Sequence, residues 1–157
     1  MFNQNLPLYV PVETGPSFWG PGDRYTFLVT GAQSDGAYFI MEATVPPGGG
    51  PPPHIHRREQ ESFYLLDGTL DIRMGDKVVQ AATGDFVHIP CGEVHNFTNT
   101  GDTTARMLLI FSPGGIEGFF EDSLEKVTDR TAEQPQNMDV VGQRYLEAVP
   151  RYGLDFV

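Results

Sequence analysis

Cationic residues are scarce in this sequence, which contains only two lysines, Lys77 and Lys126. Ten Lys and Arg residues stand against 21 Asp and Glu residues, so the formal net charge is −11. A phosphate backbone and an anionic membrane surface both attract clustered basic side chains. The composition therefore argues against nucleic acid and membranes as partners.

Cysteine and long apolar runs are scarce as well. The single Cys91 excludes an intramolecular disulfide, which fits a reducing compartment. No apolar run approaches membrane-spanning length, and the N-terminal residues lack the basic region followed by an apolar one that marks a secretory signal. We expect a cytoplasmic protein.

Glycine and proline, in contrast, are abundant, with 18 and 13 occurrences among 157 residues, and they fall between short apolar runs. This punctuation is typical of a single all-β domain, either a closed barrel or a sandwich. The runs predict strands at residues 24–30, 37–45, 61–66, 70–74, 78–80, 86–89, 94–99 and 105–111.

The two ends of the chain break this pattern. Residues 1–23 are expected to form an N-terminal arm, irregular through residue 20, over the outside of the barrel or over a partner subunit. Apolar residues at helical spacing predict short helices over 115–126 and 138–149. We expect residues 24–112 to form the barrel and 113–157 a helical tail packed on it, within one structural domain.

The stretch from residue 48 to 68 carries the clearest chemical pattern. His54 and His56 are one residue apart, so a strand points both imidazoles to the same face, and Glu61 can point inward beside them. Two imidazoles and a carboxylate outline a transition-metal site that lacks one ligand. The Pro/Gly-rich loop 46–53 leads to His54, either as a plain connection or as part of a pocket mouth.

Two histidines remain as candidates for the missing ligand. Strand alternation places His95 on one face with Phe97 and Asn99, and His88 on a face with Phe86. Alternation alone does not choose between them.

A resemblance to a known family favours His95 over His88 as the missing ligand. The chain resembles a small single-domain cupin, whose first motif is Gly, five residues, His-x-His, three or four residues, Glu, six residues, Gly. The second motif is Gly, five residues, Pro-x-Gly, two residues, His, three residues, Asn. Both are complete here, at Gly48, His54, His56, Glu61 and Gly68, and at Gly84, Pro90, Gly92, His95 and Asn99. The resemblance implies an antiparallel jelly-roll β-barrel in which one divalent metal is bound by His54, His56, Glu61 and His95.

The donor set suits Ni, Mn, Fe, Co, Zn or Cu without choosing among them. Alternation places Phe63 and Leu65 on the face of Glu61, and Phe97 on the face of His95, so we expect these three to line an apolar, aromatic substrate pocket.

The sequence also predicts the surroundings of four other features. His88 should be structural or support a ligand, and Cys91 should lie near the barrel mouth. Glu59 should be solvated beside two arginines, and the Phe119–Phe120 pair should serve packing.

The residues that lead into the tail suggest which reaction the protein catalyses. Residues 111–122 resemble the end of the barrel and the first tail helix of quercetin 2,3-dioxygenase-like cupins. This implies a metal-dependent dioxygenase that acts with dioxygen on a flavonol or a related enolisable small molecule, with Glu61 as metal ligand and general base. A non-catalytic metal- or small-molecule-binding cupin and a metal-dependent isomerase or lyase remain as alternatives. By analogy with cupins of this size, we expect a homodimer.

Overall fold

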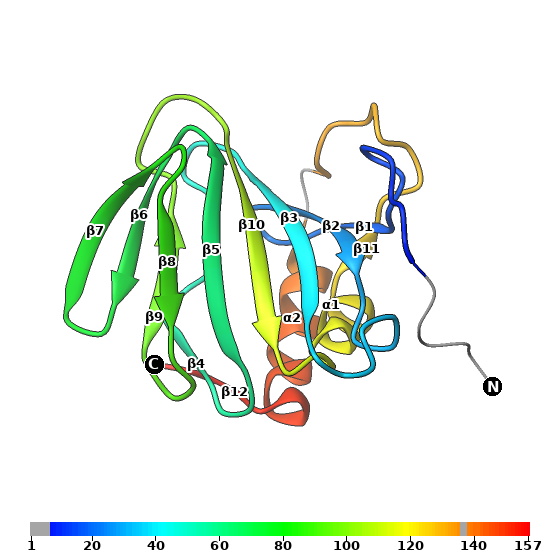
Figure 1. The fold of residues 1–157 in the computed structure, drawn as a ribbon. Coiled ribbons are helices and arrows are strands. Elements are labelled where there is room, and N and C mark those ends of the chain that lie inside the picture. The colour runs from blue at the N-terminus through cyan, green and yellow to red at the C-terminus, as the bar shows by residue number, and fades with distance from the viewer. Residues whose placement is uncertain (1–6, 136–137) are drawn as a thin grey trace.

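Two antiparallel sheets dominate the structure, a computed structural model that describes residues 7–135 and 138–157 (Figure 1). The larger sheet has the strand order β11 (Glu125–Lys126), β1 (Ser17–Trp19), β2 (Arg24–Val29), β3 (Phe39–Val45), β10 (Ala105–Ser112), β5 (Gln60–Asp67) and β8 (Phe86–Ile89). The smaller sheet has the order β12 (Leu154–Phe156), β4 (His54–His56), β9 (His95–Thr98), β6 (Thr69–Met74) and β7 (Lys77–Ala82).

The chain crosses from one sheet to the other at most connections between β3 and β10. Within the described ranges, no strand of one sheet pairs with a strand of the other. The predicted all-β, antiparallel architecture is therefore confirmed, and its two sheets form a sandwich that strand pairing does not close into a barrel.

The core lies between the sheets. Every second residue of β3 has no exposed surface, namely Phe39, Met41, Ala43 and Val45. Leu70 and Ile72 of β6 join the same core from the smaller sheet. This alternation is the one expected when each sheet buries a single face against the other.

The tail forms two helices, α1 (Glu117–Ser123) and α2 (Asp139–Ala148), and a 3₁₀ turn, η1 (Val149–Tyr152). Both helices were predicted, although each is shorter than expected. The ring of Phe120 in α1 lies 6.0 Å from that of Phe39 and 6.2 Å from that of Phe111, so this helix packs on the core. Among the described residues, no helix is long and apolar enough to cross a membrane.

The ends of the chain contribute strands that were not predicted. The expectation of an irregular segment through residue 20 is wrong for β1, which pairs with β2 on one side and with β11 of the tail on the other. Residues 1–6 of the predicted arm lie outside the described residues. The tail also supplies β12, which pairs with β4. Residues 17–19 and the two short tail strands are thus part of the two sheets.

Candidate metal centre

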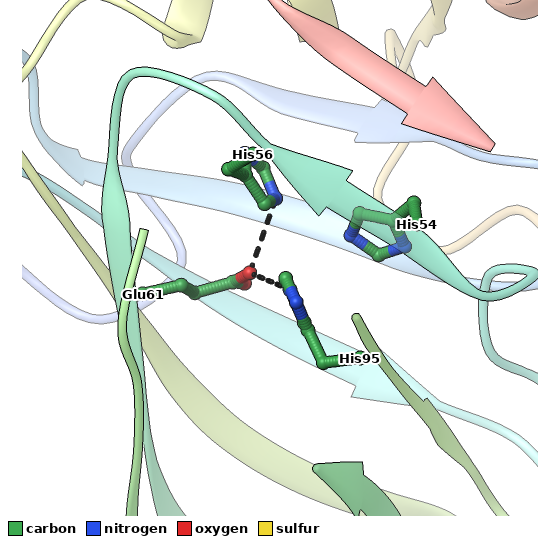
Figure 2. A group of neighbouring side chains, drawn as sticks. All are labelled: His54, His56, Glu61 and His95. Carbon is green, nitrogen blue, oxygen red and sulfur yellow. Dashed lines mark hydrogen bonds and ion pairs between the residues drawn. The ribbon is translucent and has the colours of Figure 1, made fainter. Parts of the chain in front are cut away.

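Three strands bring the predicted ligands together between the sheets (Figure 2). His54 and His56 share one face of β4, and His54 is the register partner of His95 on β9. Glu61 comes from β5 in the opposite sheet. The one-residue spacing in the sequence therefore becomes a three-imidazole wall facing a carboxylate.

The four side chains converge closely. Glu61 Oε2 lies 2.7 Å from His95 Nε2 and 3.2 Å from His56 Nε2 (Figure 2). One ligand atom from each residue can be chosen so that all four lie within 4.8 Å of one another. No member is more than 9% exposed, and His95 is only 1% exposed. The cluster is therefore compact and shielded from solvent.

The outer nitrogens of the rings are held by acceptors. His54 Nδ1 lies 2.9 Å from the carbonyl oxygen of Pro52, and His95 Nδ1 lies 2.9 Å from that of Glu93. Because a carbonyl oxygen only accepts, these nitrogens carry the proton and leave the Nε2 lone pairs directed inward. This is the arrangement that a metal-ligating histidine requires.

A second carboxylate lies near the outer nitrogen of His56, at ion-pair distance but without a hydrogen bond. Glu59 was predicted to be solvated, but it is 5% exposed and its Oε2 lies 3.6 Å from His56 Nδ1. The prediction was wrong because Glu59 shares the alternation of Glu61, two residues on, and so faces inward. The two-residue spacing of Glu59 and Glu61 is the sequence signal that indicates an inward-facing Glu59.

The cluster perturbs the pKa of its members in opposite directions. Burial, followed by the neighbouring His95 and His56, lowers the pKa of His54 to about 4. Burial also acts to lower the pKa of His56, but the carboxylates of Glu59 and Glu61 outweigh it and raise the value to about 9. Burial acts to raise the pKa of Glu61, yet His56 and His95 hold it well below its usual range. Glu61 is therefore a carboxylate across the physiological range.

These residues fit a transition metal. Three buried imidazoles and one carboxylate are the nitrogen and oxygen donors that Mn, Fe, Co, Ni, Cu and Zn accept. No Lys or Arg side chain forms an ion pair with Glu61 within the described part of the chain. A divalent cation would take the place of the protons that the metal-free cluster carries.

A small aromatic cavity of about 30 Å³ adjoins the cluster. Phe63 and Phe97 line it, together with Phe111 of β10 and Phe119 and Phe120 of α1. The Phe119–Phe120 pair thus packs in the core and also forms part of the cavity wall. Leu65 is fully buried but does not line this cavity.

Two further candidates lie outside the cavity. His88 is exposed, and its Nδ1 lies 2.9 Å from Ser62 Oγ on the outer face of β5. Cys91 is exposed as well, and its thiol donates to the carbonyl oxygen of His56 at 3.4 Å. Neither side chain contributes an atom to the cluster.

Comparison with known proteins agrees with this architecture. Residues 41–111 match the Cupin_2 family model, described as a cupin domain. The chain is 31% identical to quercetin 2,3-dioxygenase of Bacillus subtilis over 111 residues, which is 64% of this chain and 32% of that enzyme. It is 28% identical to polyketide synthase CurC of Streptomyces cyaneus over 92 residues, 59% of this chain and 60% of that protein. The chain therefore spans about a third of the Bacillus enzyme's length.

Solved structures share the fold. KdgF from Halomonas sp. has a TM-score of 0.63 and 15% identity, covering 71% of this chain and 97% of that one. A predicted oxalate decarboxylase from Thermotoga maritima has a TM-score of 0.62 and 24% identity, covering 68% and 99%. At these identities the likeness concerns the fold alone.

Proposed function

Residues 41–111 are a cupin domain, and from this premise we propose that the protein is a metal-dependent dioxygenase of a flavonol, such as quercetin, or of a related enolisable small molecule. The metal would be one divalent transition ion held by His54, His56, Glu61 and His95. Dioxygen would be the co-substrate, and a homodimer is the assembly we expect.

The observation that carries the proposal is the buried three-histidine, one-glutamate cluster with its Nε2 atoms directed inward. The 31% identity to quercetin 2,3-dioxygenase supports the choice of reaction. The aromatic walls support the choice of substrate, because rings such as Phe63 and Phe111 favour a flat, apolar molecule.

Glu61 would be the proton acceptor. A bound divalent metal supplies Lewis acidity, which lowers the pKa of a substrate hydroxyl. The Glu61 carboxylate is buried in a cavity lined largely by aromatic rings, so it would take the proton of the substrate's 3-hydroxyl without competition from bulk water. The Nε2 atoms of His56 and His95 lie 3.2 and 2.7 Å from Glu61 Oε2 and so set the position of this carboxylate. Overall, one dioxygen is incorporated into the flavonol, its heterocycle opens and one carbon monoxide leaves.

Oxygen uptake tests the proposal. Protein loaded anaerobically with Ni, Mn, Co or Fe, one metal at a time, should consume dioxygen with quercetin or with simple diketones and should release carbon monoxide from quercetin. Absence of uptake with every metal and both substrate types contradicts it. Glu61→Gln should abolish turnover while retaining part of the bound metal, because the amide keeps an oxygen donor but not the base.

A second candidate, an oxygen-independent isomerase or lyase, is favoured by a different observation. Besides CurC, the relatives include the tetracenomycin polyketide synthase protein TcmJ of Streptomyces glaucescens, 24% identical over 98 residues. Chains of alternating ketones are enolisable, so the same carboxylate would serve as base. Turnover of such a ketone under nitrogen supports this candidate, whereas bound metal with no turnover of any substrate supports a non-catalytic binding protein.

A further inference from the structure

A second, larger chamber adjoins the metal cavity and has a volume of about 240 Å³. Four side chains line both spaces, namely Tyr25, Pro51, Tyr145 and Phe156. The chamber's lining runs from Leu146, which is 61% exposed, to the buried Tyr25. The chamber therefore leads from the surface to the wall of the metal cavity.

The metal cavity alone is too small for an organic substrate. Its volume of about 30 Å³ equals the share of liquid volume taken by one water molecule, whereas sites for drug-sized molecules occupy roughly 300–1,000 Å³. A molecule whose reacting group lies at Glu61 must place its remaining atoms elsewhere. The outer chamber, at about 240 Å³, is the adjoining space that comes near this range.

The chamber contains a buried carboxyl group with a free oxygen. Asp23 is 3% exposed, and its Oδ2 accepts a hydrogen bond of 2.8 Å from the hydroxyl of Tyr25. Its Oδ1 has no hydrogen-bond partner among the residues that the structure describes. Buried polar atoms are almost always paired in folded proteins, so an acceptor without a protein partner at a cavity wall can receive a hydrogen bond from water or from a bound molecule.

The environment of Asp23 favours a neutral donor over a cation. Burial raises the pKa of Asp23 to about 6, against the opposing effects of the Tyr25 hydroxyl and the Gly50 backbone amide. The surrounding surface is apolar and aromatic, with Pro51, Tyr145 and Phe156 as neighbours. A hydroxyl donates to a carboxyl in either protonation state, and an aromatic ring matches the remaining walls.

We propose that the outer chamber binds the body of a hydroxylated aromatic substrate, with one of its hydroxyl groups donating to Asp23 Oδ1 and its reacting end directed at Glu61. This rests on the proposed function only for the position of the reacting end. The Tyr145–Phe156 ring pair, with centroids 5.6 Å apart, lines both spaces, so a substrate that spans them would contact both rings.

Binding of quercetin to metal-free protein under nitrogen tests the proposal without requiring turnover. Gly142→Phe adds a ring at the lining of the chamber, where a Cβ built on this residue of α2 has no atom within 4 Å. Val140→Phe is the matched control, since Val140 lies on the same helix, is 65% exposed and lines neither space. We expect Gly142→Phe to weaken quercetin binding by at least tenfold and Val140→Phe to leave it within twofold.

The role of Asp23 is tested by comparing quercetin with flavone, which has the same rings and no hydroxyl groups. Asp23→Leu should weaken quercetin binding by about ten- to a hundredfold, the loss expected for a buried hydrogen bond to a carboxylate, and leave flavone binding unchanged. Asp23→Asn, which keeps an acceptor, should retain most of the affinity. Near-ultraviolet circular dichroism verifies that each variant is folded.

Three results overturn the proposal: no binding of quercetin to the wild-type protein, equal affinity in wild type and Gly142→Phe, or an equal loss for flavone and quercetin in Asp23→Leu. Tight, Asp23-dependent binding without oxygen uptake supports this inference and contradicts the dioxygenase. Oxygen uptake with a KM that Gly142→Phe does not change contradicts this inference and leaves the dioxygenase standing.

Discussion

Phe156 on the last strand is the antiparallel register partner of His54, the first of the candidate ligands. The same strand places Leu154 opposite His56, so β12 covers the free edge of the ligand-bearing β4. On its other side, β4 is paired with β9 only through His54 and His95. The C-terminal strand therefore supports the strand that presents two imidazoles.

Removal of residues 154–157 should weaken metal binding. Without β12, β4 becomes an edge strand of three residues, and its histidines lose their fixed direction. We expect at least a tenfold loss of Co²⁺ affinity, measured by competition with a chelating dye, and a lower melting temperature. Asp155→Ala is the control, because it breaks only the exposed ion pair with Arg57 and should change the free energy of unfolding by about 0–1 kcal/mol. Equal Co²⁺ affinity in the truncated and full-length chains would show that β12 does not hold β4 in its metal-binding position.

Glu59→Gln should lower metal affinity without removing a ligand. The Glu59 carboxylate is the acceptor nearest to His56 Nδ1, and loss of such an outer partner reduces metal affinity by about 10- to 100-fold in metalloproteins. Isothermal titration with Co²⁺ or Zn²⁺ measures the change. The exposed side chain of Glu93 provides the matched control, Glu93→Gln, since only the backbone carbonyl of Glu93 contacts His95. Unchanged affinity in Glu59→Gln would show that His56 is oriented by other contacts.

Asp23→Asn should stabilise the protein at neutral pH and lose that advantage in acid. The pKa of Asp23 is raised from 3.8 to about 6, so its contribution to stability is complete below pH 4 and is lost as the pH rises through 6. The shift corresponds to about 3 kcal/mol. The unfolding free energy of Asp23→Asn minus that of the wild type should therefore grow by about this amount between pH 4 and pH 7. Urea unfolding measures it, with the exposed Asp102→Asn as background; a difference that does not vary with pH contradicts the burial of a charged Asp23.

Gly50→Ala should destabilise the fold more than Gly48→Ala. Gly48 has φ +80° with open space at its Cβ position, so alanine there costs about 1–2 kcal/mol in backbone conformation alone. Gly50 has φ +128°, and a Cβ there would lie 2.0 Å from the carbonyl oxygen of Phe97. The Pro/Gly-rich loop would have to move away from β9, next to the metal cavity. Equal melting temperatures for the two variants would contradict this close approach.

Strand alternation points to His54, His56 and Glu61, because their spacing is a local determinant of direction. The choice of His95 over His88 as the fourth residue rests on the resemblance to the cupin motifs and not on spacing. Glu59 obeys the same alternation, but the neighbouring arginines suggested solvent instead. Local patterns carry no information on the pairing of β12 with β4, because about a hundred residues separate them.

The sequence does not predict the two cavities, because they too depend on contacts between segments that are far apart in the chain. Their volumes depend on how α2 and β12 pack against the Pro/Gly-rich loop, which no spacing encodes. The sequence of this loop is compatible with a plain connection and with a pocket mouth, and the structure places Pro51 in the lining of both spaces. The burial of Asp23 likewise depends on long-range contacts, which no local sequence pattern indicates.

The most direct test of the account is the metal content of the purified, metal-loaded protein, measured by inductively coupled plasma mass spectrometry for the wild type and for a His54→Ala/His95→Ala variant. We predict one divalent transition ion per wild-type chain and less than about a tenth of that in the variant, because two of four ligands are lost. Equal metal content in the two proteins, or none in either, would contradict a metal centre at His54, His56, Glu61 and His95.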